Sequence, residues 1–506
     1  MTKIGEFGHD ARIMTKLPDF AFDNSYHREL SGAYAQWQGD KVPAPQMLKL
    51  NVALAEELGL DADALAGEAG ALVFTGMRAP TGAAPLAMAY AGHQFGGFSP
   101  QLGDGRALLL GELIDRFGRR RDLHLKGSGR TPFSRGGDGK AALGPVLREY
   151  LIGEAMHALG IPTTRALAAV TTGEKIHRET GAKDGAVLAR IASSHLRVGS
   201  FQFFAARGDT EMLQKLADYA IARHDPDLVG REGRYLSFLK RVAERQASLV
   251  AQWVNIGFVH GVMNTDNMTI SGETIDYGPC AFLDSYSPKA SFSSIDQQGR
   301  YAYGNQPNMA AWNLARLAEC LLGLINADDD KAIAEATAVI NNFPTLYQAA
   351  WLTGVRQKLG LLQDKEGDLA LANGFLMTMQ GQNVDYTQAF RALAEAVLGN
   401  TSPLRALYDD PSKELDGWLA AYFARIGEEA QTPQGRAAEM NATNPLYIPR
   451  NHKVEEALQA AEAGDMAPFE ALLKVLQTPF TEQPNAESYS LAAPDSFGPY
   501  KTFCGT

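Results

Sequence analysis

His260-Gly-Val-Met-Asn-Thr-Asp-Asn267, followed by Asp276-Tyr-Gly278, is the stretch of this 506-residue sequence that most constrains its fold. Asn267 and Asp276 carry amide and carboxylate oxygens, which are the ligands that Mg²⁺ and Mn²⁺ prefer. Together with the features described next, they are candidate ligands of a divalent ion. We therefore predict a metal site formed by Asn267 and Asp276.

Features on the N-terminal side of this stretch follow a recognisable order. A glycine-rich turn at residues 96–105 leads into an apolar strand, and the next strand, residues 121–126, ends at Lys126. A helix pattern over residues 140–159 then contains Glu149. Enzymes that hold a triphosphate need such a lysine, kept in place by an acidic partner, together with metal ions. Lys126 is thus expected to contact phosphates, and Glu149 to orient Lys126 by an ion pair.

The order of these features predicts an α+β fold, the protein-kinase-like bilobal fold with a strand-rich N-lobe and a helical C-lobe. Each feature alone is weak, because a lysine at a strand end is usually a solvated edge residue and Asp-Tyr-Gly is usually a turn. We divide the chain into an N-terminal extension (1–85), an N-lobe for the nucleotide (86–193), a C-lobe core (194–330) and a helical C-terminal region (331–506). Both end regions are expected to be helical.

Finer patterns predict individual elements. Residues 167–171 and 186–191 are typical of strands, and the polar segment 179–185 between them is typical of a loop. Residues 329–464 have mostly helical patterns, with breaks expected at Pro344, Pro403 and Pro411.

Charge and composition exclude several classes of function. The net charge is −11 with both signs interspersed, so a nucleic-acid partner or an anionic membrane surface is not expected. No apolar run reaches the roughly 18 residues that a membrane span needs. Only three cysteines are present, Cys280, Cys320 and Cys504, which excludes a zinc cluster or a disulfide framework as the organising principle. We expect a soluble, cytoplasmic monomer.

Two departures from the kinase pattern bear on the chemistry. Val262 stands where a kinase has its catalytic aspartate, and a valine cannot accept a proton; Asp266 is the obvious substitute. In Gly103-Asp-Gly-Arg106 a carboxylate occupies a loop that normally wraps phosphates, where it would repel them. Arginines at 106, 190 and 197 offer planar forks for phosphate oxygens, which favours a triphosphate bound in an altered orientation.

Long motifs over nearly the whole chain resemble the selenoprotein O family, also called YdiU. Besides the opening stretch they are Phe22-Asp-Asn-Ser-Tyr26, Gly92-His-Gln-Phe-Gly-Gly97, Pro100-Gln-Leu-Gly-Asp-Gly-Arg106, Leu125-Lys-Gly-Ser-Gly-Arg-Thr-Pro132 and Gly160-Ile-Pro-Thr-Thr-Arg165. The resemblance implies a kinase fold that binds ATP in a flipped orientation and transfers AMP to protein hydroxyls. For some members it also implies transfer of UMP with Mn²⁺.

Carried over by position, the resemblance makes Asp266 the proton acceptor and Asn267 and Asp276 the ligands of Mg²⁺ or Mn²⁺. Besides Asp276, the positions that it implies for contact with the nucleotide are Gly103, Gly105, Arg106, Lys126, Asp138, Gly139, Arg190 and Arg197. Cys504 stands where some eukaryotic members carry selenocysteine. A disulfide between Cys280 and Cys504 is therefore a hypothesis for redox regulation.

Three functions remain open on these grounds. The leading one is a protein nucleotidyltransferase that transfers AMP from ATP to Ser, Thr or Tyr hydroxyls, with UMP from UTP as a further reaction. The second is a kinase that uses Asp266 as its base. The third is a catalytically inactive pseudokinase scaffold that binds nucleotide and acts by docking.

Overall fold

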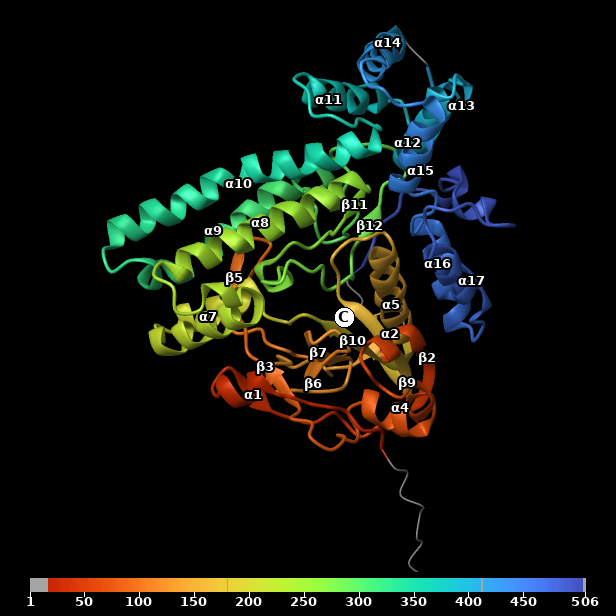
Figure 1. Cartoon of the computed structure of the whole chain (residues 1–506). Helices are drawn as coiled ribbons and strands as arrows, with labels where there is room; N and C mark the ends of the chain where they lie inside the picture. The colour runs from red at the N-terminus through yellow and green to blue at the C-terminus, as the bar shows by residue number, and fades with distance from the viewer. Residues whose placement is uncertain (1–16, 180, 411–412, 504–506) are drawn as a thin grey trace, which may run out of the picture.

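The computed structural model describes residues 17–179, 181–410 and 413–503. These residues form a mixed α/β structure in which the N-terminal region is rich in strands and the C-terminal region is helical (Figure 1). The sheet lies at the bottom of Figure 1, long helices cross above it, and the last helices, α16 (Asn451–Glu462) and α17 (Ala467–Leu476), lie at the right. A loop-rich segment at residues 256–305 lies between the sheet and the long helices.

One eight-stranded antiparallel sheet dominates the N-terminal region. Its strand order is β1-β3-β6-β7-β10-β9-β2, with β8 pairing to β10. The strands are β1 (Tyr34–Gln36), β2 (Gln46–Leu50), β3 (Leu86–Met88), β6 (Ala107–Ile114), β7 (Arg120–Lys126), β8 (Ala141–Ala142), β9 (Arg165–Arg178) and β10 (Gly181–Ala192). The small pairs are β4 (Gly92–Gln94) with β5 (Gly97–Ser99), and β11 (Phe258–Val259) with β12 (Ala281–Phe282).

Both faces of this sheet are buried. Along β10, Ala186 and Leu188 pack into the core that includes helix α5 (Leu143–Ala158), while Val187 and Ala189 pack into a second core with helix α4 (Glu68–Phe74). Successive side chains on a strand point to opposite faces, so a continuous apolar run is the pattern of a strand that is covered on both sides. The helices α1 (Ser25–Glu29), α2 (Val52–Glu57) and α3 (Ala62–Leu65) complete this region.

Two predictions about the sheet need correction. The expected loop at residues 179–185 is strand from Gly181 onward, because Ile176 is buried and Lys175 pairs with Asp184 across the ladder. The segment before residue 86 is not only helical, since it supplies β1 and β2. They form the two edges of the strand order, where β1 pairs with β3 and β2 pairs with β9.

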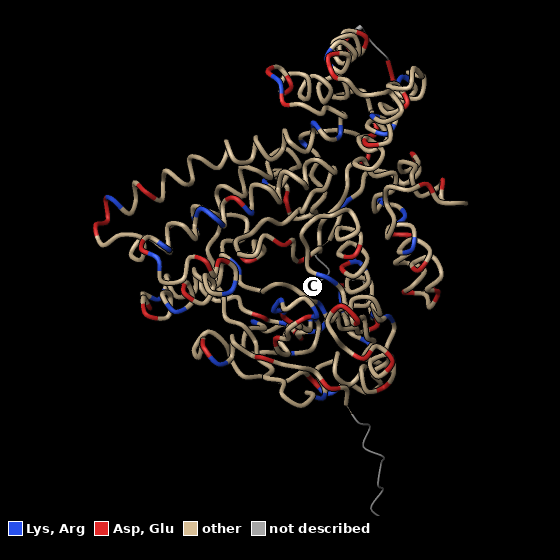
Figure 2. The backbone as a smooth tube through the Cα atoms, viewed as in Figure 1, with Lys and Arg blue, Asp and Glu red and all other residues tan. Residues whose placement is uncertain are grey.

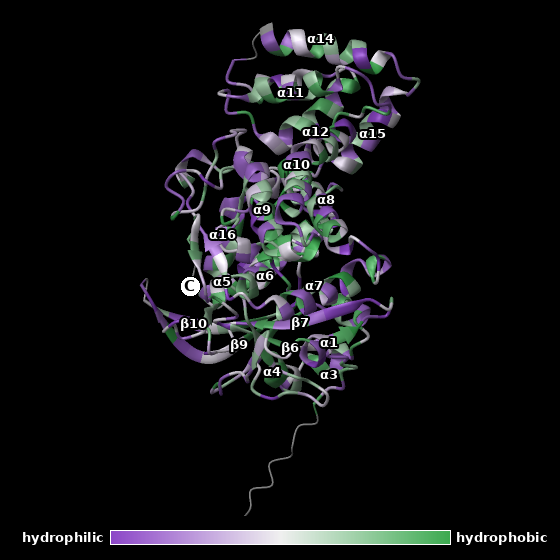
Figure 3. Ribbon diagram, turned by 90° about the vertical axis from the view of Figure 1, so that its left-hand side faces the viewer, coloured by the Kyte–Doolittle hydropathy of each residue, from purple (hydrophilic) through white to green (hydrophobic). Residues whose placement is uncertain are grey.

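The C-terminal region is built from helices. They are α6 (Val198–Ala205), α7 (Thr210–His224), α8 (Arg234–Asn255), α9 (Gln306–Ile325), α10 (Asp329–Lys358), α11 (Asp368–Met379), α12 (Tyr386–Val397), α13 (Ser402–Arg405), α14 (Lys413–Gly427), α15 (Pro433–Thr443), α16 (Asn451–Glu462) and α17 (Ala467–Leu476). Figure 3 shows α11, α12, α14 and α15 stacked at the end of the molecule farthest from the sheet.

The break expected at Pro344 does not occur, since α10 continues through this residue. Val339 and Phe343, just before it, are buried in the main core, and this packing outweighs the lost backbone hydrogen bond. Pro403 lies in the first turn of α13, where its missing N–H costs nothing, and Pro411 is outside the described residues.

Acidic and basic residues alternate over both regions, as Figure 2 shows. This distribution agrees with the interspersed charges of the sequence. Within the described part of the chain, no helix is long and apolar enough to cross a membrane.

Candidate active site

A cavity of about 450 Å³ is lined both by strands of the sheet and by the loops that precede α9. That volume lies in the range of sites for nucleotide-sized ligands. Every residue predicted to contact a nucleotide or metal lines this cavity, together with Asp266: Gly103, Gly105, Arg106, Lys126, Asp138, Gly139, Arg190, Arg197, Asn267 and Asp276. Glu149 lies behind it, on α5.

Asp276 is the centre of a charge cluster at the base of the cavity. Its Oδ1 lies 2.5 Å from Lys126 Nζ and 2.7 Å from an Arg190 guanidinium nitrogen. Glu149 contacts the same two cations, at 2.5 Å from Lys126 and 2.9 Å from Arg190. The ion pair expected between Lys126 and Glu149 is therefore present in the structure. Since β7, β10 and α5 each contribute one residue, rigid elements hold the cluster.

The backbone at Asp276 is strained, with a φ of 62° that non-glycine residues rarely adopt. Burial alone would raise the pKa of its carboxyl, but the charges of Lys126, Arg190 and Arg197 outweigh burial and hold this pKa well below its usual range. Asp276 is thus a carboxylate at neutral pH. The Asp276 carboxylate is thus held in place, with Lys126, Arg190 and Arg197 around it.

Asn267 lines the same cavity as Asp276 and stands at the end of the 3₁₀ turn Thr265–Asn267. Its Nδ2 donates a hydrogen bond to the carbonyl of Val262 at 2.9 Å, which fixes the orientation of the amide. One carboxylate and one amide oxygen are hard donors, and Mg²⁺ or Mn²⁺ commonly takes two protein ligands and completes its shell with phosphate oxygens and water. The donor set therefore fits the predicted metal.

Asp266, in the same turn, is nearly inaccessible to solvent but borders the cavity. Gln94 Nε2 donates to its Oδ2 at 2.9 Å, whereas Oδ1 has no hydrogen-bond partner among the described residues. Burial raises the pKa of the Asp266 carboxyl to about 6, although the hydrogen bond from Gln94 and the charge of Arg197 act in the opposite direction. A carboxyl with one free oxygen and such a pKa is equipped to accept a proton near neutrality.

Gln94 belongs to the β4–β5 hairpin, which packs on the turn that carries Asp266. The backbone N–H of His93 donates to Thr265 Oγ1 at 2.7 Å, and that of Phe95 donates to Asn264 Oδ1 at 3.2 Å. The segment 92–97 was recognised as a motif, but Gln94 was not among the predicted site residues. The polar side chain inside the glycine-rich segment 92–97 was the available signal.

The glycine-rich loop differs from its prediction. Asp104 is 1% exposed and turns beneath the loop, where it accepts hydrogen bonds from Met88 N–H at 3.1 Å and His124 Nε2 at 3.0 Å. This carboxylate was expected to repel phosphates from the loop; in the structure it is instead buried and bonded to Met88 and His124. Gly103 has a φ of 74°, and a Cβ there would lie 2.3 Å from the Phe133 ring, so only glycine fits.

The arginines that line the cavity differ in whether they are paired with a carboxylate. Arg178 pairs with Asp138 at 2.7 Å, a partner that the sequence did not suggest. Arg197 lies farther from its carboxylates, 3.7 Å from Asp276 and 3.8 Å from Asp104, and stacks over the Tyr90 ring. Arg106 makes no ion pair within the described part of the chain. Arg135, which is exposed and also lines the cavity, likewise makes no ion pair among the described residues, so Arg106 and Arg135 are the cavity's arginines without a carboxylate partner there.

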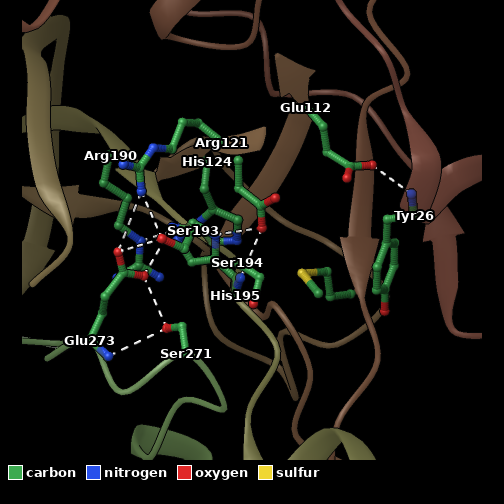
Figure 4. Close-up of polar contacts among 12 residues, drawn as sticks. Tyr26, Glu112, Arg121, His124, Arg190, Ser193, Ser194, His195, Ser271 and Glu273 are labelled. Carbon is green, nitrogen blue, oxygen red and sulfur yellow. Dashed lines mark hydrogen bonds and ion pairs between the residues drawn. The ribbon is translucent and has the colours of Figure 1, made fainter. Parts of the chain in front are cut away.

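Glu273 fastens the end of β10 to the segment that leads into Asp276. Its carboxylate accepts from the N–H and the hydroxyl of Ser193, both at 2.9 Å, and from Ser271 Oγ at 3.0 Å (Figure 4). Nearby, His195 Nδ1 pairs with Asp122 at 3.0 Å. These contacts join the strand of Arg190 to the loop of Asp276, so the two residues keep their spacing.

The candidate disulfide involves Cys504, which lies outside the described residues. Cys280 is buried, and burial raises the pKa of its thiol to about 11. The chain before Cys504 passes this segment, since Thr502 Oγ1 donates to the carbonyl of Pro279 at 2.8 Å. Arg148 reinforces the region through bonds to the carbonyls of Gly278 and Cys280.

Comparison with known proteins identifies the family. Residues 17–477 match the family model described as "Protein adenylyltransferase SelO". The chain belongs to this family. Among similar proteins, "Protein nucleotidyltransferase YdiU" of Cereibacter sphaeroides is 61% identical over 96% of this chain and 100% of its own length. Proteins of the same name from Methylorubrum extorquens and Rhizobium rhizogenes are 56% and 53% identical, over 97% and 99% of this chain and the full length of each.

Membership of the SelO family confirms the resemblance and the prediction that the chain is an enzyme. The names of its relatives support nucleotidyl transfer as the type of reaction. Those names assign no role to any individual residue.

Proposed function

We propose that this chain transfers AMP from ATP to Ser, Thr or Tyr hydroxyls of other proteins, and that it does so on a protein-kinase-like bilobal fold. In this proposal residues 86–193 form the N-lobe and residues 194–330 the C-lobe core, with residues 1–85 and 331–506 as extensions. The observation that carries the proposal is Asp266: a buried carboxyl with one free oxygen borders the same cavity as Lys126, Arg190 and Asp276.

The reaction requires a hydroxyl oxygen to attack the α-phosphorus of ATP. The new bond joins that oxygen to the phosphorus, and the bond from the phosphorus to the oxygen that bridges to the β-phosphate breaks. Pyrophosphate leaves with the electron pair, while the hydroxyl proton passes to Asp266. Val262, at the kinase position for the base, cannot accept this proton. Asp266 is the only carboxylate in the segment 260–267, and we assign it this role.

The basic residues stabilise the triphosphate and the charge that develops on pyrophosphate. Lys126, Arg190 and Arg197 are held on strands or at a helix start, and Arg106 approaches from the glycine-rich loop. Charges that are already oriented need little rearrangement as the reaction proceeds, which is the main source of electrostatic stabilisation. Gly103, Gly105 and Gly139 keep the neighbouring backbone free of side chains, and Asp138 orders its loop through Arg178.

Asn267 and Asp276 would hold Mg²⁺ or Mn²⁺, which when bound neutralises phosphate oxygens. The same arrangement would accept UTP for transfer of UMP, since all the contacts proposed so far are to phosphates and not to a base.

A cysteine pair, Cys280 with Cys504, remains the proposed redox-sensitive link between the tail and the Asp276 segment.

Labelled ATP tests the reaction. The protein is incubated with ATP labelled at the α- or the γ-phosphate, with Mg²⁺ or Mn²⁺ and an unfolded acceptor polypeptide that contains Ser, Thr and Tyr. Transfer of the α-label alone, lost in Asp276→Ala, is expected. Transfer of the γ-label would instead indicate a kinase that uses Asp266, and transfer of neither label would indicate a pseudokinase scaffold. α-Labelled UTP in a parallel reaction measures transfer of UMP.

A further inference from the structure

The tip of the β4–β5 hairpin presents an exposed aromatic side chain at the rim of the cavity. Phe95 is 39% exposed and lines the same cavity as Asp266. Its φ is 51°, a conformation that is costly for a bulky residue. Two hydrogen bonds hold it there, because the Phe95 N–H is shared between Asn264 Oδ1 and Tyr301 Oη, each at 3.2 Å. An apolar ring fixed in a strained, exposed position beside a reactive carboxylate indicates a binding role.

The loop before α9 adds an apolar and a cationic side chain. Ile295 also lines the cavity and is 52% exposed. Arg300 lies against the hairpin, with its guanidinium about 3.8–4.0 Å from the position that a Cβ on Gly96 would take. It stacks over the Trp312 ring at 4.9 Å, and it makes no ion pair with any residue that the structure describes. Its Nε is buried and has no hydrogen-bond partner in the same set of residues.

We propose that Phe95, Ile295 and Arg300 form a docking surface for the acceptor polypeptide, one that favours an apolar side chain and an acidic side chain near the modified hydroxyl. This proposal rests on the proposed function and specifies its substrate. Phe95 and Ile295 line the same cavity as Asp266, so a segment bound there would bring its hydroxyl close to the Asp266 carboxyl. Arg300, a cation without a carboxylate partner in the structure, supplies the complement for an acidic residue.

The acceptor, and not the nucleotide, is the ligand that fits these residues. The groups suited to the triphosphate, Lys126 and Arg190, cluster around Asp276, whereas Phe95 and Ile295 lie at the rim and are open to solvent. Apolar anchors with a charge at their edge are typical of protein interfaces, where buried aromatic and arginine contacts supply most of the binding energy.

Binding of two matched peptides tests the surface without requiring catalysis. Both peptides carry a central Ser with a Phe beside it; one has flanking Glu residues, and the other has Lys at the same positions. Fluorescence anisotropy with the full chain and a non-hydrolysable ATP analogue gives their affinities. The wild type is expected to bind the acidic peptide about tenfold more tightly, the change that one charge pair commonly provides. Arg300→Glu should reverse the preference.

Phe95→Asn tests the apolar contact, because asparagine tolerates the left-handed backbone and keeps the N–H that bonds to Asn264 and Tyr301. We expect weaker binding of both peptides and an unchanged affinity for the ATP analogue. Phe117→Ser, which removes a 70% exposed phenylalanine from the β6–β7 turn, is the matched control and should leave peptide binding unchanged.

The docking surface would be overturned if the wild type bound both peptides equally or bound neither. It would also be overturned if Arg300→Glu kept the wild-type preference, or if Phe95→Asn lost as much affinity for the nucleotide as for the peptides. Transfer of α-label to the same peptides is measured separately. Specific binding without transfer would count against the proposed reaction and leave the docking surface standing, so the two failures are distinguishable.

Discussion

Gln94 Nε2 donates a hydrogen bond to Asp266 Oδ2 across 172 positions of sequence, whereas Asp266 Oδ1 is buried and has no hydrogen-bond partner among the described residues. The hairpin that carries Gln94 is tied to the same turn through Thr265 and Asn264. Gln94 therefore fixes the orientation of the Asp266 carboxylate relative to the hairpin.

Gln94→Leu is expected to lower kcat for transfer of α-label by about tenfold or more, because a hydrogen bond to a charged group contributes about 1.5–3 kcal/mol. KM for ATP should change by less than about twofold, since Gln94 touches none of the basic residues proposed to hold phosphates. Initial rates at varied ATP separate the two constants. Gln252→Leu, on α8, is the control, because the Gln252 side chain bonds to Ser248 on the same helix. Equal changes in kcat and KM with a lower Tm would indicate a purely structural role.

His124 links the buried Asp104 to Arg190. Arg190 Nε donates to His124 Nδ1 at 3.2 Å, and His124 Nε2 lies 3.0 Å from Asp104. Burial, the largest cause, lowers the pKa of His124 and favours the neutral ring, in which Nδ1 accepts and Nε2 donates. A ring in this state orients Arg190 for a phosphate.

His124→Phe should therefore raise KM for ATP about tenfold, the effect of one lost hydrogen bond to a charged group, and leave kcat at saturating ATP nearly unchanged. His124→Gln, whose amide carries both a donor and an acceptor, should recover part of the affinity. His177→Phe, at an exposed position on β9, serves as the control. A fall in kcat without a change in KM would show that Arg190 does not act on bound ATP.

The sequence predicted the features that depend on local pattern. Strands β6 and β7 and helix α5 follow from periodicity, and the ion pair of Lys126 with Glu149 was predicted from the kinase-like order in which these elements occur. The contacts that complete the site depend on residues far apart in the chain. Gln94 reaches Asp266 only after the hairpin packs on the 3₁₀ turn, and periodicity carries no information about that packing.

Tertiary packing also explains the errors. The β9–β10 ladder extends beyond its apolar parts because pairs such as Lys175 with Asp184 continue it on the exposed side. Helix α10 continues through Pro344 because its buried face is held by the core. Asp104 was expected to repel phosphates because the sequence does not show that its side chain bonds to His124 on β7.

Gly139 should not tolerate a side chain. Its φ is 71°, and a Cβ there would lie 2.1 Å from the carbonyl oxygen of Gly129. Gly139→Ala is expected to destabilise the fold by more than about 3 kcal/mol and to abolish binding of an ATP analogue, because the strain in φ adds to a clash with backbone. Gly118→Ala has a similar φ of 75° but an open surrounding, and should cost only about 1 kcal/mol. Urea unfolding of both variants measures the difference, and equal losses would contradict the steric argument.

Lys358 is a buried amine without an ion-pair partner among the described residues. It is 4% exposed, and its Nζ lies 3.8 Å from the centre of the Phe390 ring. Burial lowers the pKa of Lys358 from 10.5 to about 7. In the unfolded chain the amine stays protonated up to about pH 10.5, whereas in the folded chain it loses its proton near pH 7. Between these values folding releases a proton, so the free energy of unfolding rises with pH.

Lys358→Met should therefore stabilise the protein most at pH 7 and below, where the wild type carries the full penalty of a buried charge, by up to about 4 kcal/mol. The gain should shrink as the pH rises from 7 toward 10, because the wild-type folded chain then holds a neutral amine. Tm measured at pH 7 and pH 9.5 gives the difference, and Lys331→Met, at an exposed position on the same helix, controls for the loss of a positive charge. If Lys358→Met lowered Tm equally at both pH values, the amine would be charged in the folded state and stabilised by the Phe390 ring.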